Sequence, residues 1–183
     1  MLSTNTNNTA SFCKESLKKQ DRKKIYRSKI RIGLPKTNVY NYLLNMSNRF
    51  IFNKFIKDGI KITENIDYST FYLLYDFKLL SKKRNFIVAE SKMQIKMGEK
   101  ILDIVYMKSI DHKFEFDYEN SERAKIYSSG YFVTDCENPQ ESLLGFWIES
   151  EITNDENLQD TIMKDYLNHI KNLRDNLMFN EIN

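Results

Sequence analysis

The stretch RAKIYSSGYFVTD, Arg123 to Asp135, alternates in the way that a β-strand requires. Alternate positions of a strand point to the same face of a sheet, so Tyr127 and Tyr131 share one face and Gly130 falls on the other. Other expected strands are also rich in aromatic residues, since the chain has 12 Phe, 11 Tyr and 1 Trp in 183 residues. The stretch therefore predicts a sheet that turns an aromatic face toward the interior of the protein.

The length and composition predict one globular domain. A chain of 183 residues that is 41% hydrophobic is long enough for a substantial core. Two cysteines do not make a disulfide framework, and Cys13 lies in the N-terminal segment. The first 24 residues lack the apolar segment of a secretory leader, and no window has the roughly 18 apolar residues of a membrane span. We therefore expect a cytoplasmic protein that meets membranes peripherally.

Charge is distributed unevenly along the chain. Lys14 to Arg31 holds nine basic and two acidic residues, whereas Asp135 to Asp160 holds eight acidic residues and no Lys or Arg. A basic end can attract the phosphates of nucleic acid or of anionic lipid, and a solvated face with a frayed terminus explains the same pattern. Because the chain starts with a segment rich in Ser, Thr and Asn, we expect residues 1–23 to be a disordered basic tail and residues 24–183 the folded domain.

The order of the expected elements indicates an α+β fold. Residues 24–34 alternate as a strand, with Arg27, Lys29 and Arg31 on its solvent side. Two helices are expected next, over residues 36–50 and 50–57. Further strands are expected over residues 59–67, 69–79, 85–95, 100–110, 123–133 and 142–152, followed by one amphipathic helix from about Asp155. Strands grouped apart from helices are typical of an antiparallel sheet that curls around the terminal helix.

Together with three segments, this order resembles the START (StAR-related lipid-transfer) family and its helix-grip fold. SKKRNFIVAES, residues 81–91, keeps the Arg and Phe of one family strand, and RAKIYSSGYFVTD keeps the Arg-Ala and Gly-Tyr of another. MSNRFIFNKFI, residues 46–56, has Phe-Asn where the family usually has Trp-Asp. The resemblance extends from about Lys24 to Leu177, which is most of the chain.

The resemblance implies a hydrophobic tunnel between the sheet and the terminal helix, and transfer of a lipid between membranes in place of catalysis. An acid–arginine pair of the sterol-binding branch maps to Phe71 and Glu90 and is missing, which favours a phospholipid over a sterol. The residues expected to line the tunnel are Phe71, Leu73, Tyr75, Phe77, Met107, Tyr127, Tyr131, Trp147, Leu158, Ile162, Tyr166 and Ile170. The residues expected to contact the membrane are Phe114, Phe116, Tyr118, Arg27, Lys29 and Arg31. We expect a monomer that has no cofactor, no metal and no nucleic-acid partner.

The sequence does not decide whether several side chains point into a tunnel, into a core or toward solvent. A stripe of Phe and Tyr on a strand suits a plain core as well as a tunnel wall. Family alignment turns Glu90 inward, whereas the apolar alternation of its strand turns it outward. Asp103 shares a face with Val105 and Met107, so it needs a polar partner if it is buried.

Two other functions are compatible with the same fold. Helix-grip relatives include polyketide cyclases and hydrolases, but His112 and His169 are far apart in the sequence, and the motifs of nucleophile elbows, zinc proteases and phosphate loops are absent from it. A domain with a filled core would instead serve as an interaction module. Nucleic-acid binding is disfavoured because the basic residues precede the fold and do not alternate with aromatic ones.

Overall fold

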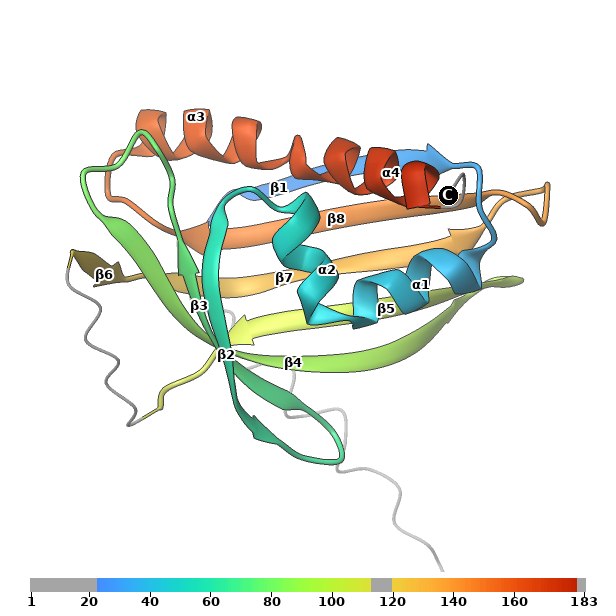
Figure 1. Cartoon of the computed structure of the whole chain (residues 1–183), viewed down its shortest axis with the longest axis horizontal. Coiled ribbons are helices and arrows are strands. Elements are labelled where there is room, and N and C mark those ends of the chain that lie inside the picture. Colours follow the sequence, from blue (N-terminus) through green and yellow to red (C-terminus); the bar gives the residue numbers. More distant parts are fainter. Residues whose placement is uncertain (1–22, 113–119, 181–183) are drawn as a thin grey trace, which may run out of the picture.

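An antiparallel sheet curls around the C-terminal helices, which confirms the α+β helix-grip prediction (Figure 1). The structure, a computed structural model, describes residues 23–112 and 120–180. Its main sheet has the order β1-β8-β7-β5-β4-β3-β2, and the short strand β6 pairs in parallel with β4. The strands are β1 (Ile25–Ile32), β2 (Ile56–Glu64), β3 (Ser69–Tyr75), β4 (Lys83–Met97), β5 (Lys100–Ser109), β6 (Ser121–Arg123), β7 (Lys125–Asp135) and β8 (Ser142–Glu151). The helices are α1 (Lys36–Leu44), α2 (Met46–Phe52), α3 (Glu156–Tyr166) and α4 (His169–Asn180).

The four helices lie on one side of the sheet. Figure 1 shows α3 and α4 running across the top of the curved sheet, with α1 and α2 in front of it. Among residues 23–112 and 120–180, no helix is long and apolar enough to cross a membrane. The predicted membrane-contact residues Phe114, Phe116 and Tyr118 lie outside the described residues, as do residues 1–22 of the expected tail.

The first strand follows the predicted pattern, and the first helix starts as predicted but ends at Leu44, before the predicted residue 50. Along β1, Tyr26 and Ile32 are buried, while the three basic side chains named above are exposed. Pro35 precedes α1, and its carbonyl accepts from the N–H groups of Asn38 and Val39 at 3.1 and 3.3 Å. Proline suits a helix start because its ring presets φ and its missing N–H is not needed there.

The second helix starts and ends earlier than predicted. It spans residues 46–52, and the chain has already entered β2 at Ile56. Asn45 caps the helix by accepting from Ser47 N–H at 2.9 Å. Asn53 ends it, since its side-chain oxygen accepts from Phe55 N–H at 3.3 Å. The apolar residues between Phe50 and Ile56 hide this boundary, because only Asn53 and Lys54 separate those of the helix from those of the strand.

The predicted single terminal helix is divided at residues 167–168. Asp155 caps α3 by accepting from the N–H groups of Asn157 and Leu158, each at 3.0 Å. At the division, the carbonyl of Tyr166 accepts from the ring Nδ1 of His169 at 2.5 Å. The N–H of Ile170, which would bond Tyr166 in a continuous α-helix, donates to the Leu167 carbonyl instead. The His169 side chain thus replaces the backbone hydrogen bond that the Tyr166 carbonyl would accept in a continuous helix.

Substituting Gly130 with alanine is expected to lower the free energy of unfolding by about 2 kcal/mol, because overpacking a tight site costs that order. A Cβ there would meet the Val105 carbonyl at 2.4 Å and the Trp147 ring at 2.6 Å. Chemical denaturation measures the loss. The matched control is Gly33→Ala, since its Cβ would approach only the Met178 side chain, at 3.8 Å. Equal losses in the two variants would contradict the expectation.

Candidate functional site

Aromatic rings from distant parts of the chain meet between the sheet and the helices. Ring centroids are separated by 4.6 Å for Phe146 and His169, 4.9 Å for Tyr131 and Phe146, and 5.3 Å for Phe55 and Tyr166. Further members of this interior cluster are Phe52, Tyr75, Phe77 and Phe86. Edge-to-face pairs predominate, which is a favourable geometry for aromatic rings. The rings therefore pack on one another within the grip.

Most of the predicted lining residues lie in this interior. Those that are buried in the main hydrophobic core are Phe71, Leu73, Tyr75, Phe77, Met107, Tyr131, Ile162, Tyr166 and Ile170. Leu158 is partly buried and packs against the same core. Strand alternation and helical spacing thus gave the correct inward side at ten positions, and failed at two.

Tyr127 is the first exception, since it lies half-buried at the surface. The pairing of β7 with β8 shifts register between Ile126 and Ser128, so the strand has a bulge there and alternation is interrupted. The Tyr127 hydroxyl donates to the Glu151 carboxylate, and Lys23 Nζ lies 5.5 Å from the ring centroid. Tyr127 therefore does not line the interior.

Trp147 is the second exception and lies on the outer face of the sheet. Its neighbours Phe146 and Ile148 are buried in the core, so Trp147 must point to the other side. There its ring stacks on Tyr106 at 6.4 Å, and its Nε1–H donates to Ser128 Oγ at 2.9 Å. Strand β8 carries large apolar residues on both faces, which is why alternation alone misassigned it.

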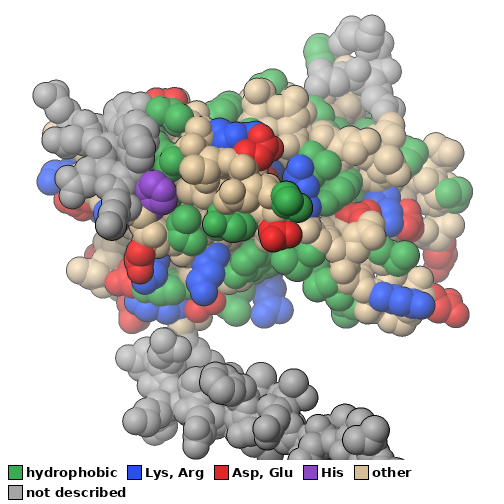
Figure 2. Space-filling model, turned by 90° about the horizontal axis from the view of Figure 1, so that it is seen from below, with side chains coloured by type: hydrophobic (Ala, Val, Ile, Leu, Met, Phe, Trp, Pro, Cys, Tyr) green, Lys and Arg blue, Asp and Glu red, His purple; other side chains and the backbone are tan. Residues whose placement is uncertain are grey.

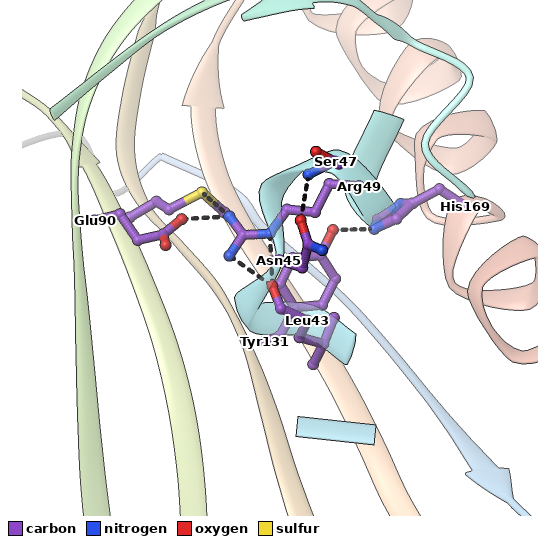
Figure 3. Close-up of polar contacts among 8 residues, drawn as sticks. Leu43, Asn45, Ser47, Arg49, Glu90, Tyr131 and His169 are labelled. Carbon is purple, nitrogen blue, oxygen red and sulfur yellow. Dashed lines mark hydrogen bonds and ion pairs between the residues drawn. The ribbon is translucent and has the colours of Figure 1, made fainter. Parts of the chain in front are cut away.

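A buried ion pair joins α2 to β4 inside the aromatic interior (Figure 3). Arg49 is 2% exposed and Glu90 is 6% exposed, and Arg49 Nη1 donates to Glu90 Oε2. Arg49 Nε and Nη2 donate to the Leu43 carbonyl at 3.0 and 2.9 Å, and Nη1 lies 3.7 Å from Met107 Sδ. Burial by itself lowers the pKa of Arg49, but the Glu90 carboxylate outweighs burial and raises it. The interior thus contains a donor and an acceptor of opposite charge.

Sequence patterns gave opposite answers for Glu90 and did not single out Arg49. Glu90 points inward with Phe86 and Val88, and the more apolar alternation of β4 belongs to its outer face. Ile87 on that outer face is buried against Tyr72 and Leu74, which produces the misleading pattern. The acid–arginine pair is absent at the two family positions, but the fold supplies a pair by bringing the arginine from α2. Only a contact between distant segments, 41 residues apart, reveals it.

Comparison with solved structures identifies the architecture. The chain has the helix-grip fold of START domains. It superposes on human StAR-related lipid transfer protein 5 with a TM-score of 0.73 and 13% identity, over 86% of this chain and 76% of that one. The lipid transfer and protein localization domain of human StarD13 gives a TM-score of 0.68 and 14% identity, over 84% and 76%.

The fold also extends to an enzyme. The Zhui aromatase/cyclase of a Streptomyces species superposes with a TM-score of 0.58 and 7% identity, over 85% of this chain and 93% of that one. No protein-family model matches the sequence, and no curated protein matches it significantly. The START resemblance seen in the sequence is therefore confirmed at the level of the fold.

A second cluster of polar contacts inside the START fold is centred on His169. Its Nε2 lies 2.9 Å from the Tyr131 hydroxyl, and its Nδ1 lies 2.5 Å from the Tyr166 carbonyl (Figure 3 shows the first contact). The carbonyl can only accept, so Nδ1 carries the proton and Nε2 accepts from Tyr131. Burial lowers the pKa of His169 to about 4, and burial raises the pKa of Tyr131 well above its usual range. Both groups are therefore neutral at pH 7. Asn53 Nδ2 donates to the Tyr166 hydroxyl at 3.1 Å.

The sequence also left open whether Asp103 points inward. Asp103 is buried and has polar partners within the protein. Lys36 Nζ lies 3.2 Å from Asp103 Oδ2 and 3.3 Å from Asp135 Oδ2. Gln94 Nε2 also donates to Asp103 Oδ1 at 2.5 Å. Burial by itself lowers the pKa of Lys36, but the two carboxylates outweigh it and raise it. This arrangement ties α1 to β5 and β7, and it satisfies Asp103 without a ligand.

Proposed function

We propose that this domain binds a lipid between its sheet and its helices and transfers it between membranes. The observation that carries the proposal is the Arg49–Glu90 pair, buried among aromatic rings in a helix-grip domain. Two of the solved structures that superpose on the chain are named as lipid transfer proteins or domains. We further propose that the domain acts in the cytoplasm as a monomer, peripherally to membranes and without catalysis.

The interior offers complementary surroundings for both parts of a lipid. Apolar side chains stabilise a hydrocarbon chain by about 0.8 kcal/mol per buried CH₂. A polar headgroup carried into such a place costs free energy unless it finds hydrogen bonds. Arg49 can donate and Glu90 can accept, so the pair meets that need.

The paired charges favour a zwitterionic phospholipid. Its phosphate complements the Arg49 guanidinium, and its ammonium complements the Glu90 carboxylate. A sterol hydroxyl can accept from Arg49 and donate to Glu90, but it carries no formal charge to complement either of them. The sequence argument against a sterol, which rested on a missing acid–arginine pair, no longer applies, because the structure contains such a pair.

A lipid must displace aromatic rings to enter. The cluster spans β3, β7, β8 and α3, and its rings are in mutual contact. We propose that α4 moves at the division of residues 167–168, where a side-chain hydrogen bond replaces part of the helical ladder. This movement would open the interior above Tyr131 and His169.

The full-length protein, incubated with liposomes of mixed lipids and re-isolated, is expected to carry one phospholipid per chain. Native mass spectrometry identifies the bound species. Phe71→Trp is expected to abolish the bound lipid, because Phe71 is buried in the interior. Tyr68→Trp is the matched control, since Tyr68 is 43% exposed in the β2–β3 loop, away from the interior and from the outer face of β4, β5, β7 and β8. Circular dichroism verifies that both variants fold.

The other outcomes of this experiment are equally informative. A stoichiometric sterol would contradict the phospholipid assignment and keep the lipid-binding one. No lipid from any mixture would overturn the proposal in favour of an interaction module, which the ring packing also suits. That module is the second candidate function.

An aromatase/cyclase-like activity is a third candidate, because one superposed structure carries that name. We propose no such activity here. The imidazole of His169 is held between Tyr131 and the Tyr166 carbonyl, so neither of its nitrogens is available to a substrate. Conversion of a linear poly-β-ketone thioester by the purified protein would contradict this view.

A further inference from the structure

The outer face of the sheet carries neighbouring apolar side chains on β4, β5, β7 and β8, next to basic residues of β1. Direct cross-strand partners share a face, and one row runs through Met93, Ile104, Phe132, Gly145 and Lys29. Val133 and Tyr131, which flank Phe132 in β7, are buried in the core, so the row lies on the opposite, outer face. The Phe132 ring covers Gly145, where a Cβ would lie 2.0 Å from its atoms.

The next row repeats this composition. It runs through Ser91, Tyr106, Gly130, Trp147 and Arg27. The Trp147 ring lies over Gly130 as the Phe132 ring lies over Gly145. Both rows start in β4, at Met93 and at Ser91, and both end at a basic residue of β1.

Beyond these rows, the β4–β5 hairpin continues the apolar surface to one end of the sheet. Met93, Ile95 and Met97 share the outer face of β4 and are 38%, 44% and 63% exposed. Leu102 is the partner of Ile95, and Lys100 is the partner of Met97. Figure 1 shows β4 and β5 reaching the right-hand end of the sheet, away from β6. We call these hairpin residues, together with the two rows, the outer band.

Basic residues border the outer band. Arg27, Lys29 and Arg31 lie exposed along β1, and Lys100 lies at the hairpin. Among the described residues, three acids lie at the margins of this part of the face: Glu99 in the turn, Glu141 beside Arg31 at 3.8 Å, and Glu149 next to the second row. Figure 2, which views the molecule from below the sheet, shows apolar side chains spread over this side among charged ones.

We infer that the outer band, led by the β4–β5 hairpin, docks the domain on an anionic lipid bilayer. Exposed methionine and isoleucine side chains can enter the interfacial region, and Tyr106 and Trp147 have the amphipathic rings that favour it. Each basic residue near an anionic surface adds attraction, which explains the basic border. A second copy of the chain is a poorer occupant, because it would bring two basic borders together. The inference rests on the proposed function, since exchange of lipid requires contact with a membrane.

Native Trp147 reports directly on this docking, because it is the only tryptophan in the sequence. The full-length protein is mixed with vesicles of phosphatidylcholine, with or without phosphatidylserine, and pelleted. Binding is expected only with phosphatidylserine, and brominated lipid is expected to quench Trp147. Ile95→Ser/Met97→Ser is expected to reduce the bound fraction at least about tenfold, by loss of apolar insertion. Arg27→Gln/Lys29→Gln is expected to reduce it about thirtyfold, by loss of two cations.

Matched controls fall elsewhere on the surface. Ile66→Ser removes a fully exposed apolar side chain from the β2–β3 loop, and should bind vesicles as the unmodified protein does. Lys164→Gln/Lys171→Gln removes two exposed cations from α3 and α4, on the helix side, and should also bind. No binding to phosphatidylserine vesicles would overturn the inference, as would binding without quenching of Trp147 or equal losses in the controls. Concentration-dependent dimers that Ile95→Ser/Met97→Ser abolishes would assign the band to a second copy.

Lipid binding in the interior and membrane docking by the outer band can be tested independently. Lipid bound in the interior is measured by native mass spectrometry after mixing with a short-chain phosphatidylcholine, without vesicles. Under docking by the outer band, Ile95→Ser/Met97→Ser keeps this bound lipid and loses vesicle binding. A protein that binds vesicles through the band and carries no interior lipid would refute the proposed function and leave the docking inference intact.

Discussion

Replacing Arg49 with methionine is expected to lower the free energy of unfolding by about 3–5 kcal/mol, because removal of one partner leaves a buried charge uncompensated. Glu90 would lose its cation in surroundings where it is 6% exposed, and the Leu43 carbonyl would lose both of its guanidinium donors. Denaturant unfolding at pH 7, monitored by circular dichroism, measures the change. The loss is the largest expected here for a single substitution.

The double variant Arg49→Met/Glu90→Leu is the decisive companion. Replacing a buried pair by apolar residues of similar volume is often close to neutral, so most of the lost stability should return. Glu90→Leu alone leaves Arg49 unpaired and should be about as unstable as Arg49→Met. Additive losses in the double variant would show that the two side chains act independently, and would contradict the ion pair as the stabilising unit.

Lowering the pH from 6.5 to about 4 is expected to remove about 3 kcal/mol of stability through His169 alone. Burial lowers the pKa of His169 from 6.5 to about 4 in the folded protein. Between these values the unfolded chain binds the proton and the folded chain does not, so acidification favours unfolding. The contribution is complete above pH 6.5 and is lost as the pH falls toward 4; further acidification adds nothing from this group.

A comparison with His169→Gln isolates this effect from the titration of carboxylates. Glutamine keeps an amide that can bond Tyr131, but it does not titrate. Unfolding free energies of both proteins are measured at several pH values between 4 and 7. The difference between the two proteins should shrink as the pH falls, and a difference that stays constant with pH would contradict a neutral, buried imidazole.

Most of the sheet could be predicted from the sequence because its strands alternate. Alternation located β1, β3, β5 and β7 and most of the inward side chains, since burial of one face leaves a period of two. The pattern failed where both faces are apolar: Trp147 and Glu90 were ambiguous or wrong because the outer band and the cluster around Ile87 imitate an inner face. The bulge at Tyr127 could not be predicted from the sequence, because it depends on how β7 pairs with β8.

The candidate site was only partly accessible for a related reason. The aromatic residues of the interior follow from periodicity, but the Arg49–Glu90 pair joins a helix and a strand, and a charged residue in an apolar helix gives no local sign of its partner. The same holds for Lys36, which satisfies two carboxylates from two strands. Polar contacts between distant segments depend on the assembled fold, so a single sequence does not disclose them.

The division of the terminal helix places one imidazole in two roles. His169 holds the end of α3 through its Nδ1, and through its Nε2 it holds Tyr131 in the floor of the grip. Every residue type except proline can donate a backbone hydrogen bond, whereas this double link requires a side chain with two ring nitrogens in one protonation state. One link between the helix and the sheet is therefore encoded in a single side chain, and is open to change by one mutation or one proton.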